Sequence, residues 1–217
     1  MRRLLLGVVV LVLSLGARGA WGGEPSLIGP TGMLLVPTAE TLGLLQWDVG
    51  AANVWADSEP DTSAIYANVG LLPRLEVGFA RLKAEEAGAE TLLNAKFGVV
   101  GLAAKTALAV GGFDLTDQID RSFYVVASHE LGAGIISPKG RFTMPRLHVG
   151  VGGGRFDGIF GGLSVTVGGK ADVMAEYDGE QVNLGVRWPL IPKVAVTAAA
   201  LDGLGDLALG VSVRSPW

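Results

Sequence analysis

Residues 171–188 (ADVMAEYDGEQVNLGVRW) alternate apolar and polar side chains along two arms joined by Asp178-Gly179. A period of two is that of a β-strand, because successive side chains leave opposite faces. Asp-Gly between two such arms is a strong hairpin signal, since the tight turn needs positive φ. With Asp178-Gly179 as a two-residue loop, Ala175 is expected to face Val182. One face of the predicted hairpin is wholly apolar, and the other carries charges and glycine.

The same alternation continues from Gln46 to the C-terminus, and no helical period of useful length interrupts it. The predicted strands are 46–55, 63–72, 75–82, 91–99, 105–113, 121–131, 145–152, 159–167, 171–178, 181–188, 193–201 and 206–214. Evenly spaced short strands predict an all-β fold, either a sandwich or an up-and-down antiparallel barrel of about twelve strands, with ten as the other count.

Charge separates the connections between these strands into two groups. Odd-numbered connections carry the acids Asp57, Glu59, Asp61, Glu85, Glu86, Glu90, Asp114, Asp117, Asp120, Asp157, Asp178, Glu180, Asp202 and Asp206. Even-numbered ones carry the bases Arg74, Lys105, Lys139, Arg141, Arg146, Lys170 and Lys193. In a meander all odd connections share one end, whereas a Greek-key sandwich would mix them. The pattern therefore favours a transmembrane β-barrel with its apolar face in lipid, its acidic loops extracellular and its basic turns periplasmic.

The first 22 residues read as a signal peptide that is removed. Arg2 and Arg3 precede an apolar run from Leu4 to Leu15, and small residues follow. That run is too short for the ~20 residues of a spanning helix. Its removal takes three arginines from 17 basic residues and leaves 14 against 21 acidic ones. This balance argues against nucleic acid as a partner and, with the barrel, predicts an outer-membrane location.

Residues 23–45 differ from the predicted barrel, residues 46–217. Pro30 and Pro37 forbid a regular central strand or helix there. The segment is expected to be an irregular lead-in or a plug inside the barrel.

In a membrane barrel, polar side chains are expected to face the lumen, because a charged side chain that faces lipid at the midplane would cost about 2–4 kcal/mol. The polar side chains predicted to face the lumen are Asp48, Asn68, Glu76, Asn94, Lys96, His148, Asp172, Glu176, Asn183, Arg187 and Arg214. The predicted interfacial aromatic girdle is Trp55, Phe113, Tyr177, Trp188 and Trp217. The terminal aromatic resembles the signal read by the barrel assembly machinery, so this machinery and outer-membrane lipid are expected partners. A narrow or plugged lumen and a small pore are both compatible with this composition.

Catalytic groups are sparse. Ser128, His129 and Glu130 are consecutive in one strand, so alternation places His129 on the face opposite Ser128, and no relay forms between them. His148 is the other candidate, on the polar face. Two histidines without cysteine give no metal motif and no cofactor is expected. The chain is predicted not to be an enzyme. The alternatives are a lipid-modifying outer-membrane enzyme and a soluble secreted β-protein.

Three segments resemble one family, the YjbH-type outer-membrane proteins of exopolysaccharide production. They are residues 29–39 (GPTGMLLVPTA), residues 121–128 (RSFYVVAS), and residues 160–162 (FGG) followed by 175–178 (AEYD), Asn183 and Gly185. Family members are typically longer and often lipoproteins, whereas this chain has no cysteine to acylate. The resemblance implies an accessory or passive-channel role in envelope or extracellular polysaccharide export, with polysaccharide-export components as partners.

Overall fold

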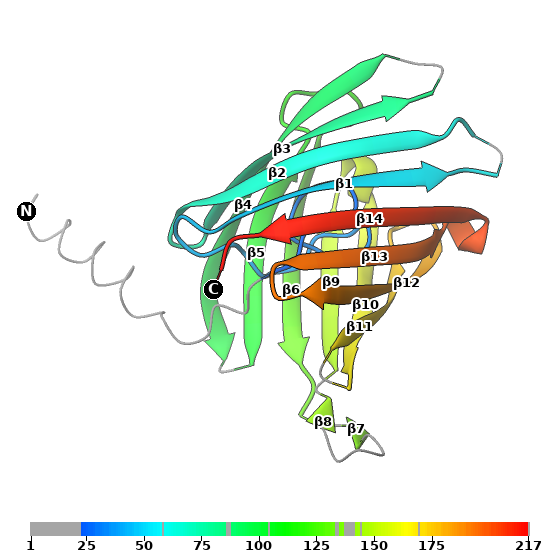
Figure 1. Cartoon of the computed structure of the whole chain (residues 1–217). Helices are drawn as coiled ribbons and strands as arrows, with labels where there is room; N and C mark the ends of the chain where they lie inside the picture. The colour runs from blue at the N-terminus through cyan, green and yellow to red at the C-terminus, as the bar shows by residue number, and fades with distance from the viewer. Residues whose placement is uncertain are drawn as a thin grey trace, which may run out of the picture.

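A computed structural model describes residues 23–57, 59–85, 88–103, 105–132, 135–136, 142–143, 145–168 and 170–216 (Figure 1). The predicted signal peptide and Trp217 lie outside these residues. Within the described part of the chain, no helix has both the length and the apolar character needed to cross a membrane.

The strands form a closed antiparallel barrel, which confirms the predicted fold. The wall strands are β1 (Trp47–Trp55), β2 (Thr62–Leu72), β3 (Leu75–Ala84), β4 (Ala89–Ala103), β5 (Thr106–Phe113), β6 (Ser122–Glu130), β9 (Arg146–Gly152), β10 (Gly158–Val167), β11 (Ala171–Tyr177), β12 (Val182–Ile191), β13 (Val194–Leu201) and β14 (Asp206–Arg214). Each pairs with its neighbour in sequence, and β1 pairs with β14 to close the wall. Two short strands, β7 (Ile135–Ile136) and β8 (Phe142–Thr143), form a separate hairpin between β6 and β9. Short 3-10 turns η1 (Gly154–Phe156) and η2 (Asp202–Leu204) follow β9 and β13.

The wall has its apolar side outward. Along β4, Leu93 and Phe97 are 49% and 45% exposed, whereas Asn94 and Lys96 are 5% and 2% exposed. A soluble barrel would place these groups the other way round, because exposed apolar rows are unfavourable in water. Apolar residues outside and polar ones inside are the pattern of a membrane barrel.

The β11–β12 hairpin keeps the predicted faces, but the predicted register is wrong by two residues. Ala175 pairs with Leu184 rather than with Val182. The carboxylate of Asp178 accepts the N–H groups of the two residues that precede Val182, which places Asp178 at the first position of the turn instead of in its centre. A shift of two residues preserves the alternation, so the same side chains face outward.

The connections define two ends of the barrel. The acidic end has the loops β1–β2, β3–β4, β5–β6, β9–β10, β11–β12 and β13–β14, and the basic end has the five connections between them. The strand β12 runs on to Ile191 through a register shift, so the turn expected at 189–192 is reduced to Pro192-Lys193. The β7–β8 hairpin extends from the basic end (Figure 1).

Residues 23–42, called the plug below, lie inside the barrel (Figure 1). Leu27, Met33, Leu34 and Val36 are at most 2% exposed. The plug enters and leaves at the basic end: Glu24 pairs with Arg214 at the end of β14, and the chain after the plug bonds to the end of β2 through Leu45 N and Gly70 O.

Wall glycines make room for the plug's apolar side chains. A Cβ added at Gly185 would lie 2.5 Å from a methyl of Leu34, and one added at Gly210 would lie 2.7 Å from a methyl of Leu27. These inward positions therefore admit no larger residue without displacing the plug. Toward the acidic end the remaining lumen is filled by the packed rings of Phe113, Tyr124, Phe156 and Phe160.

Candidate functional site: the plug and the polar inner wall

The plug has little regular structure, so its peptide groups need partners from the wall. Within the plug, the isolated β-bridges pair Pro25 with Thr31 and Gly32 with Pro37. Buried backbone N–H and C=O groups without partners are costly, which explains why charged wall residues point at this backbone.

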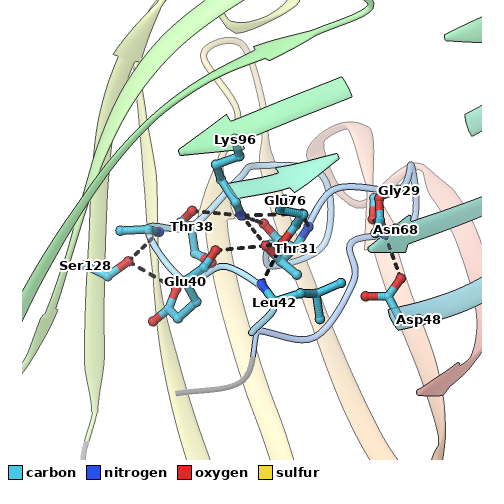
Figure 2. A network of polar contacts seen from close by, with 12 residues as sticks. Gly29, Thr31, Thr38, Glu40, Leu42, Asp48, Asn68, Glu76, Lys96 and Ser128 are labelled. Carbon is cyan, nitrogen blue, oxygen red and sulfur yellow. Dashed lines mark hydrogen bonds and ion pairs between the residues drawn. The ribbon is translucent and has the colours of Figure 1, made fainter. Parts of the chain in front are cut away.

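Glu76 of β3 binds two separate parts of the plug (Figure 2). Its carboxylate accepts the backbone N–H of Thr31 at 2.9 Å, the hydroxyl of Thr31 at 2.8 Å and the N–H of Leu42 at 3.0 Å. Thr31 and Leu42, at the two ends of the second half of the plug, are thus fixed to one side chain.

Lys96 of β4 lies opposite Glu76 in the register, and its Nζ is 4.0 Å from the carboxylate. The ammonium also donates to the carbonyl oxygens of Thr31 at 2.6 Å and Thr38 at 3.2 Å, and to the Thr31 hydroxyl. A fully buried ammonium is tolerated only when it is paired and hydrogen-bonded in this way.

Glu176 of β11 holds the other side of the plug. Its carboxylate accepts the N–H groups of Leu34 at 2.9 Å and Leu35 at 2.8 Å, and the side-chain amide of Asn183 at 3.3 Å. The two bonds to Leu34 and Leu35 fix the turn between Pro30 and Pro37.

Arg187 of β12 binds carbonyl oxygens of the plug, whereas Glu176 binds its N–H groups. Its Nη2 donates to the carbonyl oxygens of Pro25 at 2.8 Å and Met33 at 2.7 Å. Asp172 is its direct partner in the β11–β12 register, and it accepts a hydrogen bond from Thr166.

Asn68 of β2 links the plug to β1, donating to Gly29 O at 2.7 Å and to Asp48 Oδ1 at 2.6 Å (Figure 2). Farther along, Asn94 accepts the backbone N–H of Asp114 in the β5–β6 loop at 3.0 Å. Polar side chains thus follow the inner wall from the basic end to an acidic loop.

A cavity of about 270 Å³ opens beside the plug at the basic end. The charged and hydroxyl side chains that line it are Glu24, Thr38, Glu40, Arg146, His148, Ser164, Thr166, Lys170, Asp172, Arg187 and Arg214. Glu40 of the plug lies 3.6 Å from Arg146, and Ser128 Oγ lies 2.7 Å from His148 Nδ1.

The structure places every predicted lumen residue on the inner side of the wall. Nine are at most 5% exposed, and Asp172 and Arg214 are half-buried. Of the predicted girdle, Trp55, Tyr177 and Trp188 are 44–50% exposed on the outside.

The predicted girdle position of Phe113 is wrong. Phe113 is 2% exposed, and its ring packs edge-on at 5.8 Å from Phe156. Alternation along β5 puts Ala109, Gly111 and Phe113 on the inner face, and η1 brings Phe156 back into the lumen to meet it. An aromatic at a strand end can lie on either face, and only its parity relative to the wall decides which.

Sequence reasoning missed the side chains that meet across strands. It correctly separated His129, which is exposed and bonded to Thr106, from Ser128. It did not find that Ser128 pairs with His148 of β9, because that register depends on the long β6–β9 connection. Glu40, an acid within an apolar segment, was the available signal for a buried contact.

Among the described residues there is no group of three or more His, Cys, Asp or Glu side chains placed to hold a metal ion.

No protein-family model and no curated protein matches the sequence. Solved structures, in contrast, match the fold of the chain. The KdgM porin superposes with a TM-score of 0.55 at 10% identity, covering 78% of this chain and 99% of that one. The KdgM porin in complex with disordered oligogalacturonate gives 0.54 at 9% identity, covering 78% and 99%. The NanC porin gives 0.49 at 8% identity, covering 78% and 100%. At such identities only the fold is shared: the chain is a closed twelve-stranded antiparallel barrel with the fold of the KdgM porin.

Proposed function

We propose that this protein is an outer-membrane barrel with an accessory or passive-channel role in the export of envelope or extracellular polysaccharide, and that the plug closes it. The observation that carries the proposal is the contact between the plug's backbone and the charged inner wall. Glu76, Lys96, Glu176 and Arg187 bind main-chain atoms of the plug rather than forming a self-contained core.

The geometry favours a plug that can move. Its two ends leave at the basic end, so it can withdraw without threading a strand through the wall. The side chains it would leave behind are charged and would be solvated in a water-filled lumen, as porin interiors are.

The polysaccharide part of the proposal has two supports. Residues 29–39, 121–128, 160–162 and 175–178, with Asn183 and Gly185, resemble the YjbH-type family. The KdgM porin, which shares the fold, has been solved with an oligogalacturonate, a saccharide. Removal of residues 1–22 by a signal peptidase, insertion by the barrel assembly machinery and contact with polysaccharide-export components belong to the same proposal.

Planar-bilayer conductance tests the gate. Wild-type protein is expected to conduct rarely, and the Glu76→Ala/Glu176→Ala double variant, which frees the plug on both sides, is expected to open for a larger fraction of the time. Asp172→Asn is the matched control, since this inward carboxylate bonds to Thr166 and not to the plug. Equal open fractions in all three proteins would refute a gating plug.

Exopolysaccharide recovered from the medium tests the cargo. A strain lacking the gene is expected to release less polysaccharide, and the wild-type chain to restore release. Unchanged release in the deletion strain would refute the polysaccharide role while leaving the conductance result standing.

A further inference from the structure

Four side chains from three strands and the plug meet beside the basic-end cavity. They are Ser128 of β6, His148 of β9, Ser164 of β10 and Glu40 of the plug. His148 lies between the two serines, with Nδ1 2.7 Å from Ser128 Oγ and Nε2 3.2 Å from Ser164 Oγ. His148, Ser164 and Glu40 line the cavity.

The hydrogen bonds around Ser128 favour one tautomer of His148. The single hydroxyl proton of Ser128 is donated to Glu40 Oε2 at 3.3 Å, and its oxygen accepts the N–H of Ala39 at 2.9 Å. With its proton on Glu40, Ser128 meets His148 Nδ1 as an acceptor, and we assign the ring proton to Nδ1. In the neutral ring Nε2 then holds a lone pair, and Ser164 is the group that faces it.

We propose that Ser164 and His148 are the nucleophile and base of a hydrolytic site for short acyl esters, oriented by Ser128 and Glu40. A serine nucleophile needs an adjacent base, and the base needs a third group that holds its ring. Here that third group is the Ser128 hydroxyl, backed by the Glu40 carboxylate. The proposal goes beyond the channel role and does not depend on it.

The reaction balances with water as the only co-reactant. Ser164 Oγ attacks the ester carbonyl carbon while its proton passes to His148 Nε2, and the carbonyl electron pair moves to oxygen. Collapse of this intermediate breaks the ester C–O bond, and the departing alcohol takes the proton from Nε2. Water then attacks the acyl-Ser164 ester and gives a proton to Nε2. The carboxylic acid leaves, and Ser164 Oγ recovers that proton.

Arg146 supplies positive charge for the carbonyl oxygen. It lies directly opposite Ser164 in the β9–β10 register, and it lines the same cavity. Its guanidinium lies 3.6 Å from the Glu40 carboxylate, so its charge is close to the cluster. Stabilisation of the developing oxyanion by a fixed cation is among the largest contributions to acyl-transfer catalysis.

The cavity restricts the substrate. Its volume of about 270 Å³ falls below the range of about 300–1,000 Å³ for small-molecule sites. A short acyl group such as acetyl, on a carrier that continues out of the basic end, fits this space. Lys170 and Arg214 also line the cavity, which favours a carrier with negative charge.

Labelling with a fluorophosphonate probe tests the nucleophile directly. The full mature protein, purified from membranes in detergent, is treated with the probe, digested and analysed by mass spectrometry. The expected adduct is on Ser164, and it is expected to be lost in His148→Gln. Absence of an adduct on Ser164 in the wild-type protein overturns the proposal without any variant having to fold.

Turnover of p-nitrophenyl acetate gives the second readout. Ser164→Ala is expected to lower kcat/KM by about 100-fold or more, in line with the loss of a nucleophile–base pair. Ser212→Ala, at a buried inward serine of β14, is the matched control and should leave turnover unchanged. Heat-modifiable gel mobility confirms that each barrel is folded. Turnover in folded Ser164→Ala equal to that of the wild type also overturns the proposal.

Ser128 is a positioning residue, and its test must separate orientation from packing. Ser128→Ala is expected to lower kcat with KM little changed and to shift the pH profile of kcat/KM, because the ring loses its fixed tautomer. Ser128→Thr retains the hydroxyl and is expected to restore both. An unchanged pH profile in folded Ser128→Ala would remove Ser128 and Glu40 from the proposed relay.

Discussion

Replacing Glu176 by alanine removes the acceptor for two plug N–H groups. The bonds to Leu34 at 2.9 Å and Leu35 at 2.8 Å are short and charge-assisted, and the carboxylate is 2% exposed. Hydrogen bonds to a charged group contribute about 1.5–3 kcal/mol each, or about 3–6 kcal/mol for the pair. Release of the buried charge offsets part of this loss. We expect Glu176→Ala to lower the free energy of unfolding by about 2–4 kcal/mol.

Urea titration of the folded fraction in lipid vesicles, read by heat-modifiable mobility, measures this change. Glu176→Gln is expected to fall between wild type and alanine, because one carbonyl oxygen still accepts a bond. Asp172→Asn, which alters a bond to Thr166 alone, should change the free energy of unfolding by no more than about 1 kcal/mol. The reasoning fails if Glu176→Ala is no more destabilised than Asp172→Asn, or if hydrogen exchange at the amides of Leu34 and Leu35 is unchanged.

Three further substitutions probe other contacts. Lys96→Met leaves the Glu76 carboxylate buried without its cation, so urea titration should show a loss of about 3–5 kcal/mol, part of which Glu76→Gln in the same chain restores. Gly185→Ala puts a methyl 2.5 Å from Leu34, and overpacking should cost about 1–3 kcal/mol in the same assay. Burial acts to raise the pKa of Asp114, but backbone N–H groups of residues 118–120 lower it below its ordinary value. Its stabilisation of that loop is therefore full above about pH 4 and lost as the pH falls through the lowered pKa. Proteolysis of the loop in Asp114→Asn should be faster than in wild type at pH 7, and this difference should shrink as the pH falls below about 4.

The strands of the wall were predictable because apolar and polar residues alternate within each of them. Leu93 and Phe97 against Asn94 and Lys96 give the face without any knowledge of neighbours, and the parity of charged connections gives the order of strands. The register needs more than alternation. The hairpin at Asp178 shifted by two residues because the Asp side chain selects a turn in which it comes first.

The interior was not predictable to the same degree, because it depends on contacts between distant segments. Nothing local to β3 says that Glu76 binds Thr31, 45 residues earlier. The inward face of Phe113 follows from parity along β5, but its packing partner Phe156 comes from a short turn with no strand pattern. Alternation identifies a polar inner face, but it does not show what that face binds.

The plug is held inside the barrel by two kinds of contact, which differ in the free energy needed to break them. Its backbone bonds to Glu76 and Glu176 could be exchanged for bonds to water, so their net cost of breaking is modest. Its apolar side chains, including Leu27 and Leu34, are buried against wall glycines, and each would cost about 1.5–3 kcal/mol to expose. Withdrawal into water is therefore limited by the apolar contacts rather than by the charges. A partner at the basic end that covers those apolar side chains would shift the balance, so opening is expected to depend on a protein or ligand bound at that end more than on salt.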